Sequence, residues 1–464
     1  MQMPSTVRMF EDLPREHGFE PLVVEGHIPN ELHGTLYRNG PSLFSGHGQR
    51  VQHWFDGDGA VSGVRFSGGR ASGGVRVVQS EGLLREREAG ETLYPGYSTL
   101  PRKWTRRFMG RPKNCANTSV AAWQERLFAL FEQGLPTEVC PETLETLGES
   151  NLGGAVRGTF SAHPHYLPSR RALYNFGVNY GVGTRLAVYE MPDEGAARRL
   201  VEIPLAGATM VHDFIATDRH LVFFAPPLRM NPLPILLGLK TYGEQLTWKP
   251  EEGTEVIVVP LDDPAAYTRF TVEPFYQWHF GAAWEQGDEI CVEFVYYPDY
   301  HSAILLDDLF AGRPTVEIKS DFRRARINPS QKQLHWEVLW DNSAEFPQVS
   351  PRTLGGPTRY TYLTAHADQA FGLQDVVAKV DAKTGRVQTL GFGAHQYPSE
   401  PLFVPRASAR AEDDGYLVCY GYDVAEHRSF AAVLDARDLD QGVLARAWFD
   451  HHLPHTFHGV WVGA

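Results

Sequence analysis

Residues 413–437 read DDGYLVCYGYDVAEHRSFAAVLDAR. Two runs within this stretch, 415–423 and 430–437, are rich in β-branched and aromatic residues, and polar residues separate them, as is typical of strands joined by a turn. The pattern recurs between hairpin signals such as DAKTG at 381–385 and QGD at 286–288. Further runs of this type are RLAVYEM (185–191), HLVFFAPP (220–227), EICVEFVYY (289–297), LHWEVLW (334–340), RYTYLTA (359–365) and DVVAKVDA (375–382).

These strand signals continue from about residue 30 to the C-terminus without a linker, and helical periodicity is weak throughout. The sequence therefore predicts a single all-β domain over residues 1–464, in which residues 1–20 are interpreted as an N-terminal extension. Many short antiparallel strands fit either a sandwich or a β-propeller. No clean repeat with the roughly 40–50-residue period of standard blades is visible, so periodicity alone leaves both architectures open.

The composition limits the classes of function. The chain has 43 Lys and Arg against 56 Asp and Glu, a formal net charge of −13, which disfavours nucleic acid as a partner. The N-terminus lacks the apolar core of a signal peptide, and no run approaches the roughly 20 apolar residues of a membrane span. The four cysteines show no CxxC spacing; free thiols in a cytoplasmic protein are the simplest interpretation, with two disulfides as the alternative.

Four histidines stand in apolar or aromatic surroundings, far apart in the chain: His163 in FSAHPHY, His212 in TMVHDFI, His279 in YQWHFG and His458 in TFHGVW. A neutral imidazole is the commonest metal ligand in proteins, and a buried polar group needs a partner. Any one of these histidines taken alone is more simply a hydrogen-bonded core residue. Four such sites together predict one shared metal ion.

The spacing of these histidines indicates the kind of metal site. Gaps of 49, 67 and 179 residues match neither HExxH nor paired CxxC zinc motifs. Ligands from widely separated strands favour a propeller, because its inner strands converge on one axis. An all-nitrogen site with open positions suits Fe(II) and O2, although the usual non-haem triad has two histidines and one carboxylate.

Three glutamates have settings similar to those of the histidines: Glu132 in LFALFEQGLP, Glu345 in NSAEFPQ and Glu400 in YPSEPLFVP. Metal-bound histidines usually donate their second ring N–H to a carboxylate or a carbonyl. The three glutamates are therefore predicted to orient the ligands, and a salt bridge is the ordinary alternative for each of them.

Several longer motifs resemble those of the carotenoid cleavage oxygenase family, and bacterial apocarotenoid-cleaving members look closest. The resemblance covers roughly residues 20–464, and the motifs follow one another in the family's order. They are GHIPNELHGTLYRNGPSLF (26–44), HWFDGDGAV (53–61), KNCANTSV (113–120), LFALFEQGLPTEVCPETLETLG (127–148), SEPLFVPR (399–406) and DDGYLV (413–418), with AHPH, MVHDF and FHGVW around three of the histidines.

The resemblance implies a seven-bladed β-propeller with a non-haem Fe(II) on its axis and a cap of loops and helices over the active site. One iron per chain is held by His163, His212, His279 and His458. In the family, the residues matching Glu132, Glu345 and Glu400 hydrogen-bond the second, third and fourth ligands respectively. Thr118 matches a residue whose methyl group crowds the iron; an ordinary strand threonine is the alternative.

One position departs from the family pattern. The third ligand motif usually continues HxxNAxE, whereas this chain reads HFGAAWE from His279 to Glu285, so Ala282 replaces the Asn. This substitution puts the local packing or hydrogen bonding in doubt, but not the ligand.

The implied activity is oxidative cleavage of a conjugated C=C bond of a carotenoid or apocarotenoid, with O2 as co-substrate and two aldehydes as products. The best match is 15,15′ cleavage giving retinal, and no side chain need act as an acid or base. One alternative is a stilbene-cleaving dioxygenase, for which Tyr97 and Lys113 lie in the phenol-recognising region. Another is a non-catalytic propeller that binds carotenoid. No obligate protein partner is evident.

Two segments predict peripheral contact with a membrane, from which a lipophilic substrate would enter. Residues 226–240 (PPLRMNPLPILLGLK) supply Leu233, Leu236 and Leu237. Residues 100–113 (LPRKWTRRFMGRPK) combine Trp104, Phe108 and Met109 with six cationic residues, a composition that suits an anionic membrane surface. A buried capping helix and a solvated basic loop are the alternative. In the family, the corresponding segments form an apolar patch around the tunnel mouth.

Overall fold

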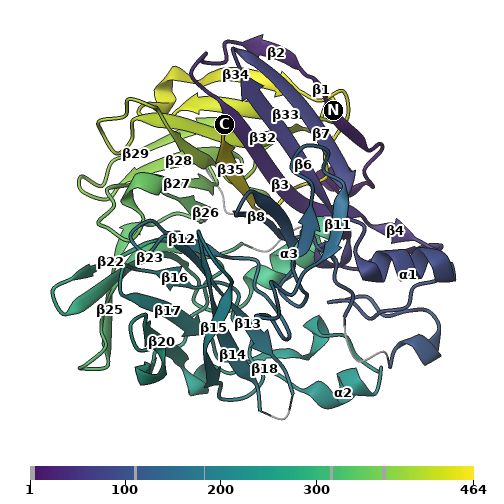
Figure 1. Ribbon diagram of the computed structural model, residues 1–464, viewed down its shortest axis with the longest axis vertical. Coiled ribbons are helices and arrows are strands. Elements are labelled where there is room, and N and C mark those ends of the chain that lie inside the picture. Colours follow the sequence, from purple (N-terminus) through teal and green to yellow (C-terminus); the bar gives the residue numbers. More distant parts are fainter. Residues whose placement is uncertain (1–5, 109–111, 182, 314–316, 368–371) are drawn as a thin grey trace.

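The computed structural model describes residues 6–108, 112–181, 183–313, 317–367 and 372–464. Within these ranges the strands form seven sheets of at least four antiparallel strands, which follow one another around a central axis in chain order (Figure 1). This is the all-β, seven-bladed propeller that the resemblance implies, and the sandwich is excluded.

Apart from the C-terminal strand of the chain, the first four sheets are built from strands between residues 17 and 272. In order of pairing they contain β1 (His17–Pro21), β7 (Arg70–Val77), β6 (Asp58–Ser67), β3 (Gly34–Leu43) and β35 (Gly459–Gly463); β11 (Thr146–Glu149), β10 (Thr137–Val139), β9 (Arg126–Leu130) and β8 (Ser119–Trp123); β12 (His165–Leu167), β13 (Ala172–Asn179), β14 (Arg185–Pro192) and β15 (Arg198–Pro204); and β16 (Ile215–Ala216), β17 (His220–Ala225), β20 (Thr254–Pro260) and β21 (Thr268–Val272).

The remaining three sheets complete the ring. They contain β22 (Phe280–Gln286), β23 (Glu289–Tyr296), β24 (Asp321–Asn328) and β25 (Gln333–Trp340); β26 (Ala344–Gln348), β27 (Tyr360–Ala365), β28 (Val376–Asp381) and β29 (Val387–Gly391); and β2 (Val23–Gly26), β34 (Val443–Trp448), β33 (Arg428–Asp435), β32 (Gly415–Asp423) and β30 (Gln396–Pro398), with β31 (Leu402–Pro405) also paired to β32.

Both ends of the chain close the ring. The C-terminal strand β35 pairs with β3 in the first sheet, and the N-terminal strand β2 pairs with β34 in the last. β35 is the innermost strand of the first blade, whereas β2 is the outer edge strand of the last blade (Figure 1). The first and last blades are therefore joined by backbone hydrogen bonds as well as by packing.

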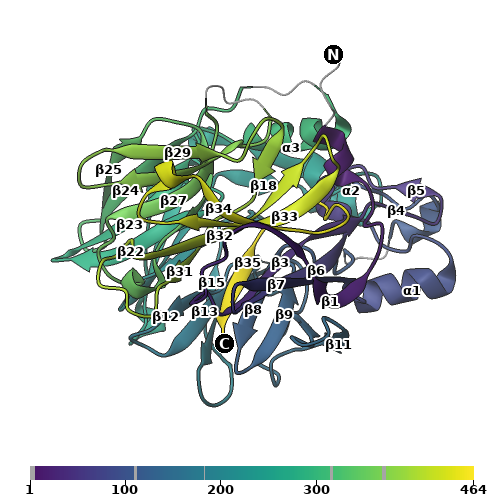
Figure 2. The same cartoon turned by 90° about the horizontal axis from the view of Figure 1, so that it is seen from above.

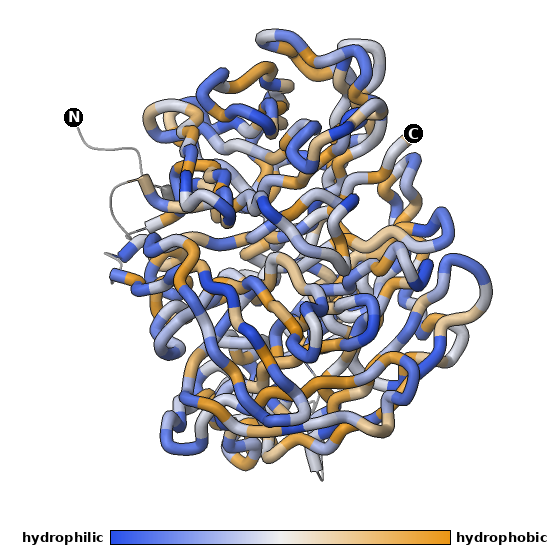
Figure 3. The backbone as a smooth tube through the Cα atoms, turned by 90° about the vertical axis from the view of Figure 1, so that its left-hand side faces the viewer, coloured by the Kyte–Doolittle hydropathy of each residue, from blue (hydrophilic) through white to orange (hydrophobic). Residues whose placement is uncertain are grey.

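The core is divided into apolar clusters wedged between neighbouring blades. Between the third and fourth blades, for example, the rings of Phe214 and Phe223 stack with centroids 5.1 Å apart, and Phe176 meets Phe223 edge-on at 5.4 Å. Hydrophobic residues are accordingly distributed along the whole chain and are not confined to one region (Figure 3). Each sheet buries both faces, which explains the nearly continuous apolar runs in the sequence.

The helices are short and lie between strands of the ring or before it. They are α1 (Glu81–Ala89), α2 (Pro232–Leu236) and α3 (Ser302–Ala311), with 3-10 turns η1 (Thr6–Phe10), η2 (Trp54–Asp56), η3 (Trp104–Arg106), η4 (Gly243–Gln245), η5 (Pro250–Glu252), η6 (Pro264–Ala266), η7 (Pro351–Thr353) and η8 (Leu439–Gln441). Two ribbons, β4 (Ser45–Gly46) with β5 (Gln49–Arg50) and β18 (Leu228–Met230) with β19 (Leu246–Trp248), complete the connections. Figure 2 shows α2 and α3 toward the same edge of the ring.

Among the described residues, no helix has the length and apolar character needed to cross a membrane. The N-terminal residues Met9 and Phe10 are fully buried, and the Phe10 ring lies 5.0 Å from Trp54 and 5.4 Å from Phe310 of α3. All four cysteines are free thiols, so the disulfide alternative is excluded.

Candidate metal centre

Each blade places one residue singled out from the sequence at the start of its innermost strand. These strands are neighbours around the axis: β8, β12, β16, β22, β26, β31 and β35. Each singled-out residue lies within its strand or at most three residues before it: Thr118, His163, His212, His279, Glu345, Glu400 and His458, in that order. A sevenfold arrangement of strands thus gathers residues that are up to 340 positions apart in the sequence.

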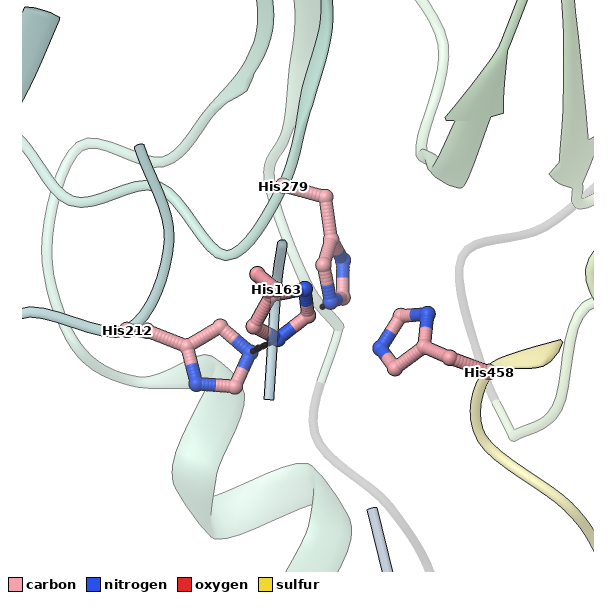
Figure 4. Close-up of side chains that lie close together, drawn as sticks. All are labelled: His163, His212, His279 and His458. Atoms are coloured by element: carbon pink, nitrogen blue, oxygen red, sulfur yellow. Dashed lines mark hydrogen bonds between the residues drawn. The ribbon is translucent and has the colours of Figure 1, made fainter. Parts of the chain in front are cut away.

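The four histidines point their rings toward one another (Figure 4). The Nε2 atom of His212 lies 3.1 Å from that of His163 and 3.4 Å from that of His279. One nitrogen from each of the four rings falls within a group whose atoms all lie within 4.8 Å of one another. The ring of His458 completes the group, with its centroid 4.6 Å from that of His163.

Carboxylates occupy the outer nitrogens of three of these rings. The Nδ1 atom of His279 donates to Glu345 Oε2 at 2.6 Å, and that of His458 donates to Glu400 Oε1 at 2.9 Å. The Nδ1 atom of His212 lies against a carboxylate oxygen of Glu132, which follows β9 rather than starting an inner strand. An ionised carboxylate can only accept a hydrogen bond, so the Nδ1 atom that donates to it carries the ring proton. The Nε2 atom of the neutral ring then has a free lone pair.

Burial keeps imidazoles neutral at the centre. It holds the pKa of His163 and of His458 well below the usual range. Burial also lowers the pKa of His279, but the charge and hydrogen bond of Glu345 outweigh it and raise that pKa. Neutral rings whose Nε2 lone pairs converge are the form that binds a metal ion.

The nitrogen cluster has the dimensions of a transition-metal site. Metal–nitrogen bonds of about 2.1 Å place ligands at right angles about 3.0 Å apart, close to the observed Nε2 separations. Imidazole donors suit iron, copper, nickel and zinc, and the four histidines leave any octahedral ion two further positions. Among the described residues, this is the one group of three or more His, Cys, Asp or Glu arranged to hold a metal.

Arg38 is a functional residue that the sequence reasoning missed. Its guanidinium is fully buried, donates to Glu400 Oε2 at 2.9 Å, and also reaches the Phe457 carbonyl and the Thr456 hydroxyl. Burial raises the pKa of Glu400, and Arg38 opposes that effect. The motif TLYRNG was visible, but nothing in it named Glu400 as the partner of Arg38, 362 residues away.

The remaining predicted positions also have definite surroundings. Thr118 lines the cavity described below, its hydroxyl donates to Asn117 at 3.0 Å, and its carbonyl accepts from the backbone N–H of His458. Ala282 is buried in a small apolar cluster with Trp284 and Val349. Apolar packing therefore replaces the polar side chain that the family usually has at this position.

A cavity lies beside the histidines, and His212, His279 and His458 form part of its wall. Most of the wall is apolar, and α3 contributes several leucines to it. Its aromatic side chains include Trp54, Phe55, Phe131, Trp278, Phe346 and Phe457. The apolar lining suits an apolar ligand held next to the four histidines.

Tyr97 and Lys113 both line this cavity, but each is already engaged. The Lys113 ammonium bonds two buried carboxylates, Asp58 and Glu86, at 2.9 Å each. The Tyr97 hydroxyl lies 3.2 Å from that of Tyr300. The two residues therefore lie at the cavity wall, and the positive charge of Lys113 is paired with Asp58 and Glu86.

The apolar side chains predicted to meet a membrane are exposed. Their exposed fractions range from 42% to 62%, for Trp104, Phe108, Leu233, Leu236 and Leu237. The two segments adjoin, since a Cβ added at Gly238 would lie 2.7 Å from that of Arg107. This rules out a buried capping helix over the described part of the segments; Met109 lies outside the described residues. We call the five exposed side chains the apolar patch.

Comparisons with known proteins agree over nearly the whole chain. A family model described as "Retinal pigment epithelial membrane protein" (RPE65) matches residues 10–463. The apocarotenoid-15,15′-oxygenase of Synechocystis is 31% identical over 98% of this chain and 95% of that relative. The lignostilbene-alpha,beta-dioxygenase isozyme III of Sphingomonas paucimobilis is 29% identical over 96% of this chain and 94% of its own. The crystal structure of cobalt-substituted Synechocystis ACO has a TM-score of 0.90 at 30% identity, covering 99% of this chain and 98% of that one.

The propeller and these matches define the class of protein as a seven-bladed β-propeller oxygenase. The chain belongs to the RPE65/carotenoid oxygenase family, because the family model covers nearly its whole length. The resemblance read from the sequence is thereby confirmed, as is the expectation that the chain is an oxygenase enzyme.

Proposed function

We propose that this chain is an Fe(II)-dependent dioxygenase that cleaves a conjugated C=C bond of a carotenoid or apocarotenoid, at the 15,15′ position, to give two aldehydes of which one is retinal. The observation that carries the proposal is the convergence of four histidine nitrogens beside the apolar cavity. His163, His212, His279 and His458 would hold the iron. When bound, Fe(II) supplies the activation of O2 that alkene cleavage needs.

The protein's own residues would then orient the substrate and exclude water. The aromatic wall of the cavity offers stacking surfaces to a polyene, which has no polar group along its length. Thr118 lines the cavity, and its hydroxyl is engaged by Asn117, so its methyl group would be the part left to restrict the space beside the iron. No side chain is required to donate or remove a proton at the double bond, which agrees with the apolar wall.

Cleavage of a hydroxystilbene is the second candidate, because the Sphingomonas relative is named a lignostilbene dioxygenase. Phenol recognition would need Tyr97 or Lys113 to accept or donate a hydrogen bond to the substrate. Lys113 already donates to Asp58 and Glu86 at 2.9 Å each. Its ammonium is therefore engaged within the protein and is not free to bind a substrate phenol, so the arrangement favours the polyene.

The proposal is tested by purifying the protein anaerobically with Fe(II) and incubating it under O2 with an apocarotenal or a hydroxystilbene. An aldehyde pair from the apocarotenal, identified by mass, supports the proposal, and the masses locate the cleaved bond. Aldehydes from the stilbene alone would establish the second candidate. Failure to bind iron would leave a non-catalytic carotenoid-binding propeller as the better interpretation.

Replacing Glu345 with Gln is expected to reduce turnover and to retain part of the iron. The amide keeps the size of the side chain but removes the charge that holds the Nδ1 proton of His279, and its single oxygen cannot accept from both His279 and Tyr297 as the two carboxylate oxygens do. Loss of such an orienting partner typically costs roughly 10–100-fold in metal affinity or activity. Iron stoichiometry and the rate of product formation are the measurements. Wild-type values for both would show that Glu345 does not orient the ligand.

We also propose that the apolar patch touches a membrane surface and that substrate enters there. Both patch segments join the cavity wall, because Tyr97 precedes the first, Pro112 lies within it, and Tyr242 follows the second. Lys103 and Arg106 beside the patch would attract anionic headgroups, although each also pairs with Glu91.

Changing Leu236 and Leu237 to Ser is expected to weaken binding to anionic liposomes severalfold and to spare turnover of detergent-solubilised substrate. Both side chains are exposed, so the change removes apolar contact area without disturbing the core. Liposome sedimentation measures the binding. Val338, an exposed residue on the outer strand β25 and far from α2 (Figure 1), provides a control as Val338→Ser. Equal sedimentation of wild type and the Leu236/Leu237 variant would refute membrane contact by this patch.

A further inference from the structure

The carboxylate of Asp213 lies where three neighbouring inner strands meet. Its Oδ1 atom accepts a hydrogen bond from His165 Nε2 of β12 at 3.1 Å and from the backbone N–H of Phe214 at 2.7 Å. Its Oδ2 atom accepts from the backbone N–H of Phe280, the first residue of β22, at 3.0 Å. The side chain is almost completely buried. One carboxylate thus joins β12 and β22 to the segment that leads into β16.

These contacts fall beside three of the four clustered histidines. Each position is one or two residues from a member of the cluster: His165 from His163, Asp213 from His212, and Phe280 from His279. Fixing the three backbone segments against one another fixes the spacing of the three imidazoles. The charge of Asp213 strengthens all of these hydrogen bonds, because a bond to an ionised acceptor is roughly twice as strong as a neutral one.

Asp213 also faces the one histidine of the cluster that no glutamate contacts among the described residues. Its Oδ1 atom lies 3.9 Å from His163 Nδ1. This separation is too long for a direct hydrogen bond, yet the negative charge favours the tautomer with the proton on Nδ1. That tautomer leaves the Nε2 atom of His163 free toward the cluster, as the glutamates do for the other three rings.

We propose that Asp213 is a positioning residue of the metal centre, setting the spacing of His163, His212 and His279 and the tautomer of His163. The inference rests on the proposed function, in that a metal occupies the histidine cluster. Asp213 touches neither the cavity nor the converging nitrogens, so it acts through the ligands alone.

Asp213→Asn tests this role with Co(II) as the probe, because the visible spectrum of Co(II) reports coordination geometry independently of turnover. The amide must turn its NH2 toward at least one of the three donors and loses the charge. We expect a 10–100-fold weaker affinity for Co(II) in chelator competition and an altered visible spectrum. Asp423→Asn is the matched control, since Asp423 is also buried and accepts from Gln396 and the Glu426 backbone within the seventh blade.

The outcomes separate this inference from the proposed function. Wild-type protein that binds no Co(II) would overturn both. Wild-type binding together with an unchanged affinity and spectrum in Asp213→Asn would overturn the positioning role alone, as would equal losses in the Asp423→Asn control. If Asp213→Asn does not fold, His165→Leu removes one donor and keeps the carboxylate. Its Co(II) affinity must then fall at least threefold, and no change would refute the role.

Discussion

His279→Ala is expected to abolish turnover and to leave little iron in the purified protein. The change removes one of four converging nitrogens, and it leaves the buried Glu345 carboxylate without the imidazole N–H it accepts. Both effects act on the same centre, so the loss should exceed the roughly 10–100-fold that follows from removing a residue that only orients a ligand. Iron per chain and aldehyde formation are measured on anaerobically loaded protein.

The matched control for this experiment is His335→Ala. His335 is exposed on β25, an outer strand, so its loss removes a histidine without touching the axis. Iron content and turnover should equal those of the wild type. Full activity in His279→Ala would remove His279 from the ligand set, while a matching loss in His335→Ala would show that the assay reports general instability.

Individual strands could be predicted from the sequence, but the number of blades could not. Residues 415–423 form β32 as expected, because both faces of this strand are buried and the run is rich in aromatic and aliphatic residues. The repeat is hidden by insertions: β18, α2 and β19 interrupt the fourth blade, and α3 interrupts the fifth. The first and last blades also exchange strands β35 and β2. Only the family resemblance implied seven.

Some residues of the candidate site could likewise be predicted from the sequence, and others could not. The grouping of His163 with its three counterparts could be predicted because four histidines in apolar settings together indicate one shared site, although a single one does not. Arg38 and Asp213 could not, because each is explained only by partners on other strands. The role of a buried charged residue depends on the residues it contacts, and the sequence does not show which residues those are.

The inner strands around the axis belong to different sheets, and side chains join several of them. Asp213 links β16 to β22, and Glu345 of β26 holds His279 beside β22. Gln348 of β26 donates to Glu400 at 3.0 Å, and Glu400 in turn holds His458 before β35. The residues that orient the histidines are therefore also the ties between blades, so we expect the metal centre and the ring to be stabilised together.

Arg38→Met is expected to lower the free energy of unfolding of the metal-free protein by about 3–5 kcal/mol, the range for breaking a buried ion pair from one side. The substitution keeps much of the side-chain volume. It leaves the Glu400 carboxylate, of which only 3% is exposed, without its ion-pair partner, and it removes the hydrogen-bond donor of the Phe457 carbonyl. Denaturant titration measures the change. Arg437→Met is the control: its guanidinium is half-exposed, and its salt bridge to Asp414 should be worth about 1 kcal/mol or less.

A second substitution tests the reason for that loss. Glu400→Gln removes the buried negative charge, so in the Arg38→Met background it should recover part of the stability instead of adding a further cost. The coupling between the two changes is expected to be at least about 1 kcal/mol, since the two charges are in direct contact at 2.9 Å. Strictly additive losses would mean that Arg38 stabilises the ring through its carbonyl contacts and not by balancing Glu400. In that case the guanidinium would tie β3 to the segment before β35 without tuning the carboxylate that orients His458.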